Sequence, residues 1–296
     1  MRHSPVFRDV LSHPTRETMH ATVEIRRSVE QGDDGQARTV LHLPDSPEDL
    51  GHFLRLFFPG HSLNIWALEP TIHQLSACIR LGKKYQCDQV VRLSLDYLKK
   101  WFTETSDAWF NVGDTIDPPQ FQRIHVIGVV NLARLADAPS LLPTALMLCC
   151  TLGAEIVDGF TREDGTRETL SPEDLGRVFA AKAKLLRFHL RATHQLFQEE
   201  VAPGCARSRV CAGVLSRLLG KVVDDEGLFN DLRWSSDWDY YVDANEVAAD
   251  CRRELCSRCY EMVTESRARE IRTQLFNDMP SMMGVTVENW AGKVET

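Results

Sequence analysis

Four cysteines in the last third of the chain have the residue type and spacing of a metal site. Cys256 and Cys259 form a C-x2-C pair, and Cys205 and Cys211 form a C-x5-C pair. Four thiolates in two pairs suit a tetrahedral structural zinc ion, for which C-x2-C is a common half-site. These four residues are therefore candidate ligands of a zinc ion, which would tie the loop at 201–211 to the last helix, although packed free thiols are the favoured interpretation.

Two other interpretations of the same cysteines stay open. C-x5-C is a loose half-site, and two cysteines at i, i+3 spacing in a helical pattern can simply be small core residues. Redox pairing is the second alternative. The nine cysteines also include Cys251 and the adjacent Cys149 and Cys150. Because the first residues lack the apolar core of a secretion signal, free thiols or metal ligands are favoured over disulfides, and we expect an intracellular protein of the cytoplasm or nucleus.

Residue types that could carry catalysis form no recognisable constellation. The chain contains no G-x-S-x-G, G-x-G-x-x-G, Walker loop or H-E-x-x-H. His189 and His194 lie five residues apart on a predicted helix, about 140° from each other, so we expect two separate surface or partly buried histidines. The sequence favours a protein that is not an enzyme. The alternative is a metal-dependent enzyme, or a zinc-stabilised regulatory protein, that uses the C-terminal cysteines.

Composition and charge narrow the class of partner. Over 296 residues the chain is 43% hydrophobic and 26% charged, which is typical of a soluble globular protein, and no run of eighteen apolar residues predicts a membrane span. The net charge is −8. Residues 224–250 contain nine acidic residues and only Arg233 as a basic one, so the net charge of this segment is −8, the same as that of the whole chain. Such a segment repels phosphate backbones, so we expect protein partners rather than nucleic acid, and no membrane contact. The segment itself is interpreted as a solvated loop and helix face, with binding of a basic partner as the alternative.

Helix signals dominate the chain, with one small sheet expected in the N-terminal hundred residues. The short branched run at 39–45 predicts a strand. Ser46 and Ser171 are each followed by proline and two acids, so each should begin a helix, the second running to about residue 200. A last long helix is expected from about 245 to 277. The predicted fold class is α+β, mainly helical.

Apolar spacing indicates which faces of these helices are buried. Residues 75–102 contain two amphipathic runs joined by a few residues, which predicts a helical hairpin, and residues 141–152 are apolar all round and should be central in a core. Asp164-Gly165 suits a tight turn within 160–170. A helix that ends at about Ala136 should bury Ile124, Ile127, Val130 and Leu135.

The order of these segments resembles a known family. SPVFRDVL, TVLHLPD, SPEDLGHFLRLFFPG and LGKKYQCDQVVRLSLDYLKKWF, in this order, resemble the second half or more of a BTB/POZ domain. LARLADAPSLLPTALMLCC, GFTREDGTRETLSPEDL and CSRC resemble the tail of a large class of fungal BTB proteins. The resemblance implies a non-catalytic protein-interaction module, a BTB adaptor or scaffold. It also implies three parts: a truncated BTB/POZ-like domain at 1–104, a helical region at 105–200 and a cysteine-containing helical region at 201–296.

Two departures from the family bear on partners. A complete BTB domain has two strands and a helix before SPVF, which supply much of its homodimer surface. This chain begins at SPVF, so we expect a monomer rather than the family dimer. Family members that recruit a cullin-type ubiquitin ligase often carry a hydrophobic-x-Glu element after the SPVF helix. The residues two positions before Glu17, Glu24 and Glu30 are Thr or Ser, so we expect weak or no cullin binding.

Overall fold

The computed structural model describes residues 4–12, 25–31, 35–57, 69–111, 118–223 and 254–292. The chain divides into two compact units. The first takes its described residues from Met1–Lys100, Asp117–Ala138 and Asp158–Thr169, and the second from Trp101–Ile116, Pro139–Val157 and Leu170–Thr296. The predicted regions at 1–104, 105–200 and 201–296 remain predictions.

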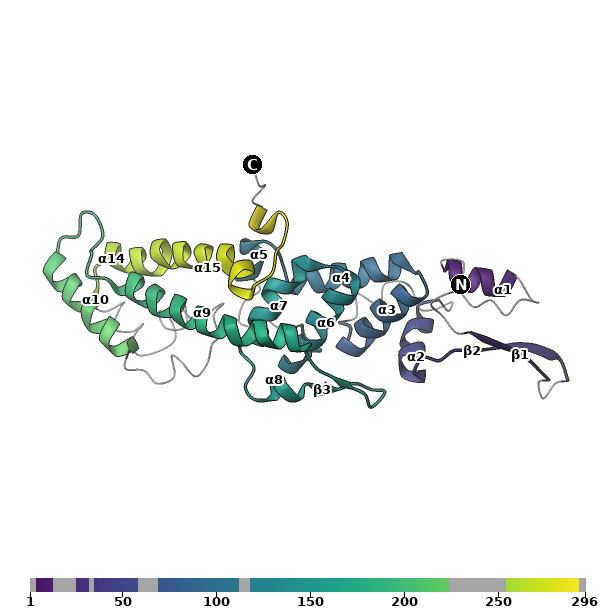
Figure 1. The fold of residues 1–296 in the computed structure, drawn as a ribbon. Coiled ribbons are helices and arrows are strands. Elements are labelled where there is room, and N and C mark those ends of the chain that lie inside the picture. The colour runs from purple at the N-terminus through teal and green to yellow at the C-terminus, as the bar shows by residue number, and fades with distance from the viewer. Residues whose placement is uncertain are drawn as a thin grey trace. The chain divides into compact units, whose positions relative to one another are not determined.

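The first unit consists of short helices and two small sheets (Figure 1). Its helices are α1 (Pro5–Ser12), α2 (Pro47–Arg55), α3 (Ile72–Lys84), α4 (Asp88–Trp101), the 3-10 turn η2 (Arg123–His125) and α6 (Val126–Ala136). Its strands are β1 (Arg26–Gln31), β2 (Ala37–His42), β3 (Phe160–Thr161) and β4 (Arg167–Glu168).

The second unit is built from longer helices. They are α5 (Ser106–Asn111), η3 (Pro139–Leu141), α7 (Leu142–Cys149), α9 (Pro172–Phe197), α10 (Ser208–Val223), α14 (Ser257–Glu261), the π-helical segment η5 (Met262–Arg267), α15 (Ala268–Met283) and η6 (Trp290–Gly292). The short α8 (Glu155–Asp158) lies at the border of the two units along the chain. Among the described residues, no helix has the length and apolar character needed to cross a membrane.

The strands are few and short, which confirms the mainly helical α+β class. β1 and β2 pair antiparallel from Arg26↔His42 to Gln31↔Ala37. The predicted strand at 39–45 therefore exists, but it begins two residues earlier and ends at His42. β3 and β4 form a second ladder of only two residue pairs around a turn in which Gly165 has φ +79°. The sequence predicted that turn but not the strands beside it.

The predicted helical hairpin is present and forms the centre of the first unit. Leu75, Ile79 and Leu98 are fully buried, and Tyr85 lies at the junction with no exposed surface. A Cβ atom on Gly82 would lie 2.7 Å from Cγ2 of Val91, so only glycine lets α3 and α4 approach this closely.

Helix α1 packs on this junction. The rings of Phe7 and Tyr85 stack with centroids 4.5 Å apart, and the Ser4 hydroxyl donates to the Tyr85 carbonyl oxygen at 2.6 Å. The Tyr85 hydroxyl donates to Asp45. Segments that are far apart in sequence, the SPVF helix and the hairpin junction, therefore form one small core.

The predicted helix starts at Ser46 and Ser171 are confirmed. Each serine has extended backbone, and its hydroxyl accepts the N–H of the residue three positions later, Asp49 or Asp174, at 3.1 Å. In both helices proline occupies the first position, where its missing N–H costs nothing.

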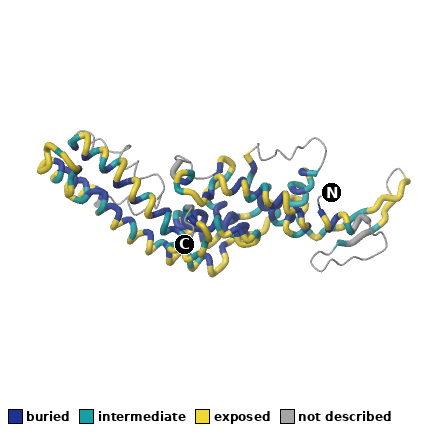
Figure 2. Tube along the Cα trace, turned by 90° about the horizontal axis from the view of Figure 1, so that it is seen from above, coloured by how far each residue is buried: buried dark blue, intermediate teal, exposed yellow. Residues whose placement is uncertain are grey.

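The second unit has its own core. Every residue of α7 is buried, as its all-round apolar sequence predicts. The longer helices around it are amphipathic, and Figure 2 shows buried and exposed residues alternating along them. Lys182 donates from α9 to the Leu152 carbonyl oxygen at 2.9 Å, which holds α9 to the segment that follows α7.

Three expectations from helical spacing need correction or fall outside the structure. Leu135 is 43% exposed, because five residues after Val130 it has turned about 140° away from that buried face. His189 is buried, whereas His194 is exposed as expected, and burial lowers the pKa of His189 to about 4. Residues 245–253 of the predicted last helix lie outside the described residues, and the described helix begins at Ser257.

Candidate metal centre

Two loop-to-helix junctions position the four cysteines. Cys256 is the residue just before α14, and Cys259 lies in the first turn of that helix. Cys205 lies in the loop before α10, and Cys211 lies in the first turn of α10. The C-x5-C pair is therefore built like the C-x2-C pair, with three additional residues in the bend. This explains why its spacing looks loose in sequence.

The four sulfur atoms converge. All four Sγ atoms lie within 4.8 Å of one another, and those of Cys205 and Cys256 are 3.6 Å apart. A tetrahedral Zn²⁺ with Zn–S bonds of about 2.3 Å places its sulfurs about 3.8 Å apart. The four cysteines thus lie close enough to hold one metal ion, with only a small contraction.

The cluster lies at the edge of a hydrophobic core. Cys211 and Cys259 have no exposed surface, while Cys205 and Cys256 are partly buried. The core around them is formed by α9, α10, α14 and the segment η5, and its buried members include Leu196, Phe197, Val214, Leu215, Leu218, Leu255 and Val263. One side of the cluster is therefore dry and the other is reachable from solvent, which gives a metal ion a route of entry.

Electrostatics favour the thiolate of Cys256 and oppose those of Cys211 and Cys259. The backbone N–H of Cys259 lowers the pKa of Cys256 to about 7, whereas burial raises the pKa of Cys259 to about 12 and also raises that of Cys211. A second anion within 4.8 Å of the first is opposed by like-charge repulsion and by desolvation. A divalent cation removes both penalties, and the protons leave when it binds.

Backbone groups and one arginine hold the loop around the sulfurs. The N–H of Ala202 donates to the Cys259 sulfur at 3.4 Å, and the Ser208 hydroxyl donates to the Cys205 carbonyl oxygen at 3.0 Å. Arg258, between the two C-terminal cysteines, donates to the carbonyl oxygens of Pro203 and Gly204 at 3.5 and 3.1 Å. The two half-sites are therefore linked through the protein as well as through the cluster. Contacts of this kind orient metal ligands.

A buried arginine fixes the chain that leads into the site. Arg267, at the end of the π-helical segment η5, is 8% exposed. Its guanidinium donates to the carbonyl oxygens of Leu196, Gln198 and Glu200 at 3.1, 3.3 and 2.7 Å. These carbonyls follow or end α9, where no helical partner remains for them. Arg267 thereby sets the path from α9 to Cys205.

The structure brings together all four cysteines that the sequence selected. Cys149 and Cys150 are buried in and after α7, apart from this group, and Cys251 lies outside the described residues. Sequence reasoning missed Arg258 and Arg267. Arg258 carries a signal, because it lies inside the C-S-R-C run. Arg267 carries none, because its acceptors lie about seventy residues earlier. No protein-family model, curated protein or solved structure matches this chain.

Proposed function

We propose that this chain is a non-catalytic protein-interaction module whose helical second unit is stabilised by a structural zinc ion. The observation that carries the proposal is the convergence of Cys205, Cys211, Cys256 and Cys259, whose Sγ atoms all lie within 4.8 Å. Four thiolates fill the four positions of a tetrahedral ion. A filled coordination shell leaves no position for water or substrate, which favours a structural over a catalytic role.

The interaction role extends the resemblance to BTB/POZ proteins. Support comes from the first unit, where the SPVF helix packs on the hairpin through Phe7 and Tyr85 and the hairpin forms one compact cluster with α2. Within the described residues, the four cysteines are the only group of three or more His, Cys, Asp or Glu residues placed to hold a metal. A catalytic metal ion would need a coordination position open to water or substrate, which four cysteine ligands do not leave.

Metal analysis of the purified full chain tests the zinc ion. We expect about one zinc per chain, and its loss in Cys259→Ser. Cys150→Ser is the matched control, because Cys150 is equally buried in the same unit but is not part of the cluster. Chelator should lower the thermal stability of the wild type and of Cys150→Ser, but it should leave Cys259→Ser unchanged. Metal-free wild-type protein with full stability would refute the zinc proposal.

Cobalt substitution separates a closed site from an open one. A four-thiolate Co²⁺ complex should show a tetrahedral absorption spectrum that does not change when azide or imidazole is added. A spectrum that shifts with these ligands would show an open coordination position and favour the metal-dependent enzyme.

A redox pair is the second candidate, favoured by the 3.6 Å between the Cys205 and Cys256 sulfurs. If wild-type protein binds no zinc but forms a reversible disulfide between these two residues under mild oxidant, the cluster is a redox device. Peptide mapping identifies that disulfide.

Cullin binding tests the choice of partner. Because the hydrophobic-x-Glu element is absent, we expect no complex between the purified chain and the N-terminal region of a cullin at micromolar concentrations. A stable complex in size-exclusion chromatography would contradict this expectation.

A further inference from the structure

Helix α9 carries an exposed apolar stripe. Phe179, Leu186 and Leu190 are 53%, 39% and 49% exposed, and the exposed Ala183 lies between them. The spacing i, i+4, i+7, i+11 places all four on one face over about 16 Å of helix. Single exposed apolar residues are ordinary, but a continuous row is characteristic of a binding surface.

After the two acids of its first turn, helix α9 carries charge of one sign. Residues 175–197 contain Arg177, Lys182, Lys184, Arg187 and Arg191 and no acidic residue, although the chain as a whole carries −8. Arg187 and Arg191 follow the stripe along one edge, about 70–110° round the helix from its centre. The surface is therefore apolar in the middle and cationic at one side.

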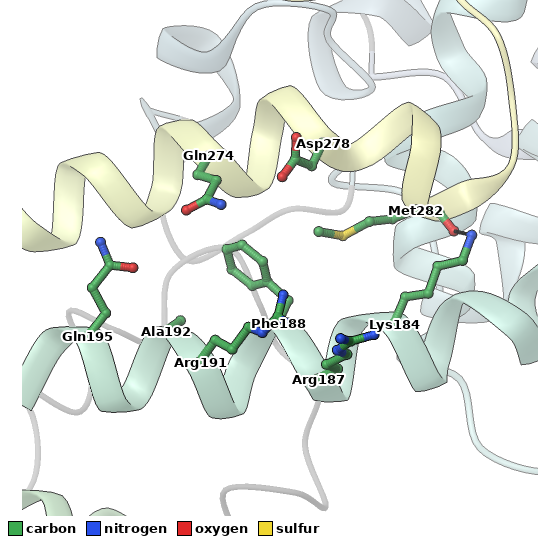
Figure 3. Close-up of a pocket in the computed structure, with 9 residues that line it drawn as sticks. All are labelled: Lys184, Arg187, Phe188, Arg191, Ala192, Gln195, Gln274, Asp278 and Met282. Carbon is green, nitrogen blue, oxygen red and sulfur yellow. Dashed lines mark hydrogen bonds between the residues drawn. The ribbon is translucent and has the colours of Figure 1, made fainter.

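A groove lies on the far side of these arginines, where Phe188 is about 170° round α9 from the centre of the stripe. It has a volume of about 340 Å³ between α9 and α15, which contact each other within the second unit. Figure 3 shows Phe188 and Met282 pointing into the space between the two helices, with Gln195 and Gln274 at one end. Lys184 closes the other end by donating to the carbonyl oxygens of Ser281 and Met282 at 3.1 and 3.2 Å. This fixes the lysine, whereas Arg187 and Arg191 line the open rim.

We propose that this surface of α9 binds an acidic amphipathic helix from another protein. An apolar stripe at i, i+4, i+7, i+11 matches the apolar face of a second helix, and the arginine edge matches carboxylates at its flank. The groove faces away from the stripe and takes no part in this contact. The inference rests on the proposed interaction function, and it does not require the zinc ion.

An anionic lipid surface is the competing occupant, and the width of the stripe opposes it. The four apolar residues span only about 60° of the helix, which is the narrow seam that one helix offers to another, whereas a helix that lies on a membrane buries a broad apolar face.

Fluorescence anisotropy on the full, zinc-loaded chain tests the proposal. The probe is a labelled synthetic 18-residue peptide with leucines at i, i+4, i+7 and i+11 and glutamates at its flanks. We expect saturable binding that weakens with salt. Leu186→Asp and Arg191→Glu should each weaken it at least tenfold. The matched controls Val210→Asp and Arg209→Glu, both on the exposed face of α10, should change it less than twofold.

The outcomes separate the alternatives. Absence of binding, or equal binding of a Glu-to-Gln or scrambled peptide, overturns the proposal. So does binding to phosphatidylserine vesicles through Leu186, or a Leu186-dependent dimer in light scattering. In a further variant the nine acids of 224–250 are replaced by Asn and Gln. If the peptide binds only to this variant, the surface binds this chain's own acidic segment, and the proposal is overturned. Zinc content measured in the same samples shows whether the proposed function fails separately.

Discussion

Replacing Arg267 by methionine should destabilise the second unit more than any exposed arginine replacement near it. Methionine keeps much of the buried stem but leaves three carbonyl oxygens, those of Leu196, Gln198 and Glu200, without their donor. An unsatisfied buried polar group costs about 1–3 kcal/mol. Only the Leu196 bond is fully buried, and water can reach the other two oxygens in part, so we expect a loss of about 2–4 kcal/mol in unfolding free energy.

Urea unfolding followed by circular dichroism measures this loss. With a slope of about 2 kcal/mol per molar urea, the midpoint should fall by about 1–2 M. The control is Arg269→Met, two residues further on an exposed position, which should stay within about 0.5 kcal/mol. Arg267→Lys should recover part of the loss, because an ammonium reaches fewer carbonyls than a guanidinium does. The effect should persist in chelator, since it depends on protein contacts. A loss below about 1 kcal/mol, or one equal to that of Arg269→Met, would refute this reasoning.

Two further predictions concern the first unit. Tyr85→Phe should lower the unfolding free energy by about 1–2 kcal/mol, because Asp45 loses one donor but keeps Lys84. Tyr85→Ala should lower it by about 3–5 kcal/mol, because it also removes the ring that stacks on Phe7. Equal losses in urea unfolding would show that the stacking is unimportant. Burial lowers the pKa of His125 from 6.5 to about 4, so the unfolded chain binds this proton first and stability should fall by up to about 3 kcal/mol as the pH drops from 6.5 towards 4. His125→Phe should remove the His125 share of this fall and leave the share of His189, whose pKa burial also lowers to about 4, and an unchanged profile would show that His125 does not contribute.

Local signals were enough to predict many of the helices. Ser46 and Ser171 begin helices because each supplies an acceptor for an N–H in the first turn, which depends on only four consecutive residues. The helix α7 is buried because its side chains are apolar except that of Thr144, whose hydroxyl donates to the Leu141 carbonyl oxygen. The four cysteines could be selected from their spacing as candidate ligands, but the same spacing also fits packed free thiols or a redox pair, and only the tertiary structure brings the four sulfurs within 4.8 Å of one another.

What the sequence did not predict depends on contacts between distant segments. β3 and β4 are two residues long and carry no strand signal of their own. Glu168 in β4 is buried because Arg80 of α3 donates to both its oxygens at 2.7 and 2.9 Å, and Asn131 of α6 donates to it at 2.6 Å. The sequence predicted a surface or partly buried His189, whereas the side chain is buried. The difference arises because the segments that pack on α9 decide which of its sides is buried. The same holds for Arg267, whose three acceptors are set by tertiary structure.

A zinc ion at the four cysteines would act chiefly by cross-linking distant parts of the chain. Cys205 and Cys256 are 51 residues apart, and the helices that follow them, α10 and α14, pack into one core with α9. In the chain-entropy model, a cross-link that closes a loop of this length stabilises the folded state by about 4 kcal/mol. That contribution is a large part of the 5–15 kcal/mol that typically separates folded from unfolded domains. Because α9 also packs on α7 and α15, zinc loss should weaken this core without releasing the helix that carries the proposed binding stripe, and the stripe variants should bind zinc normally.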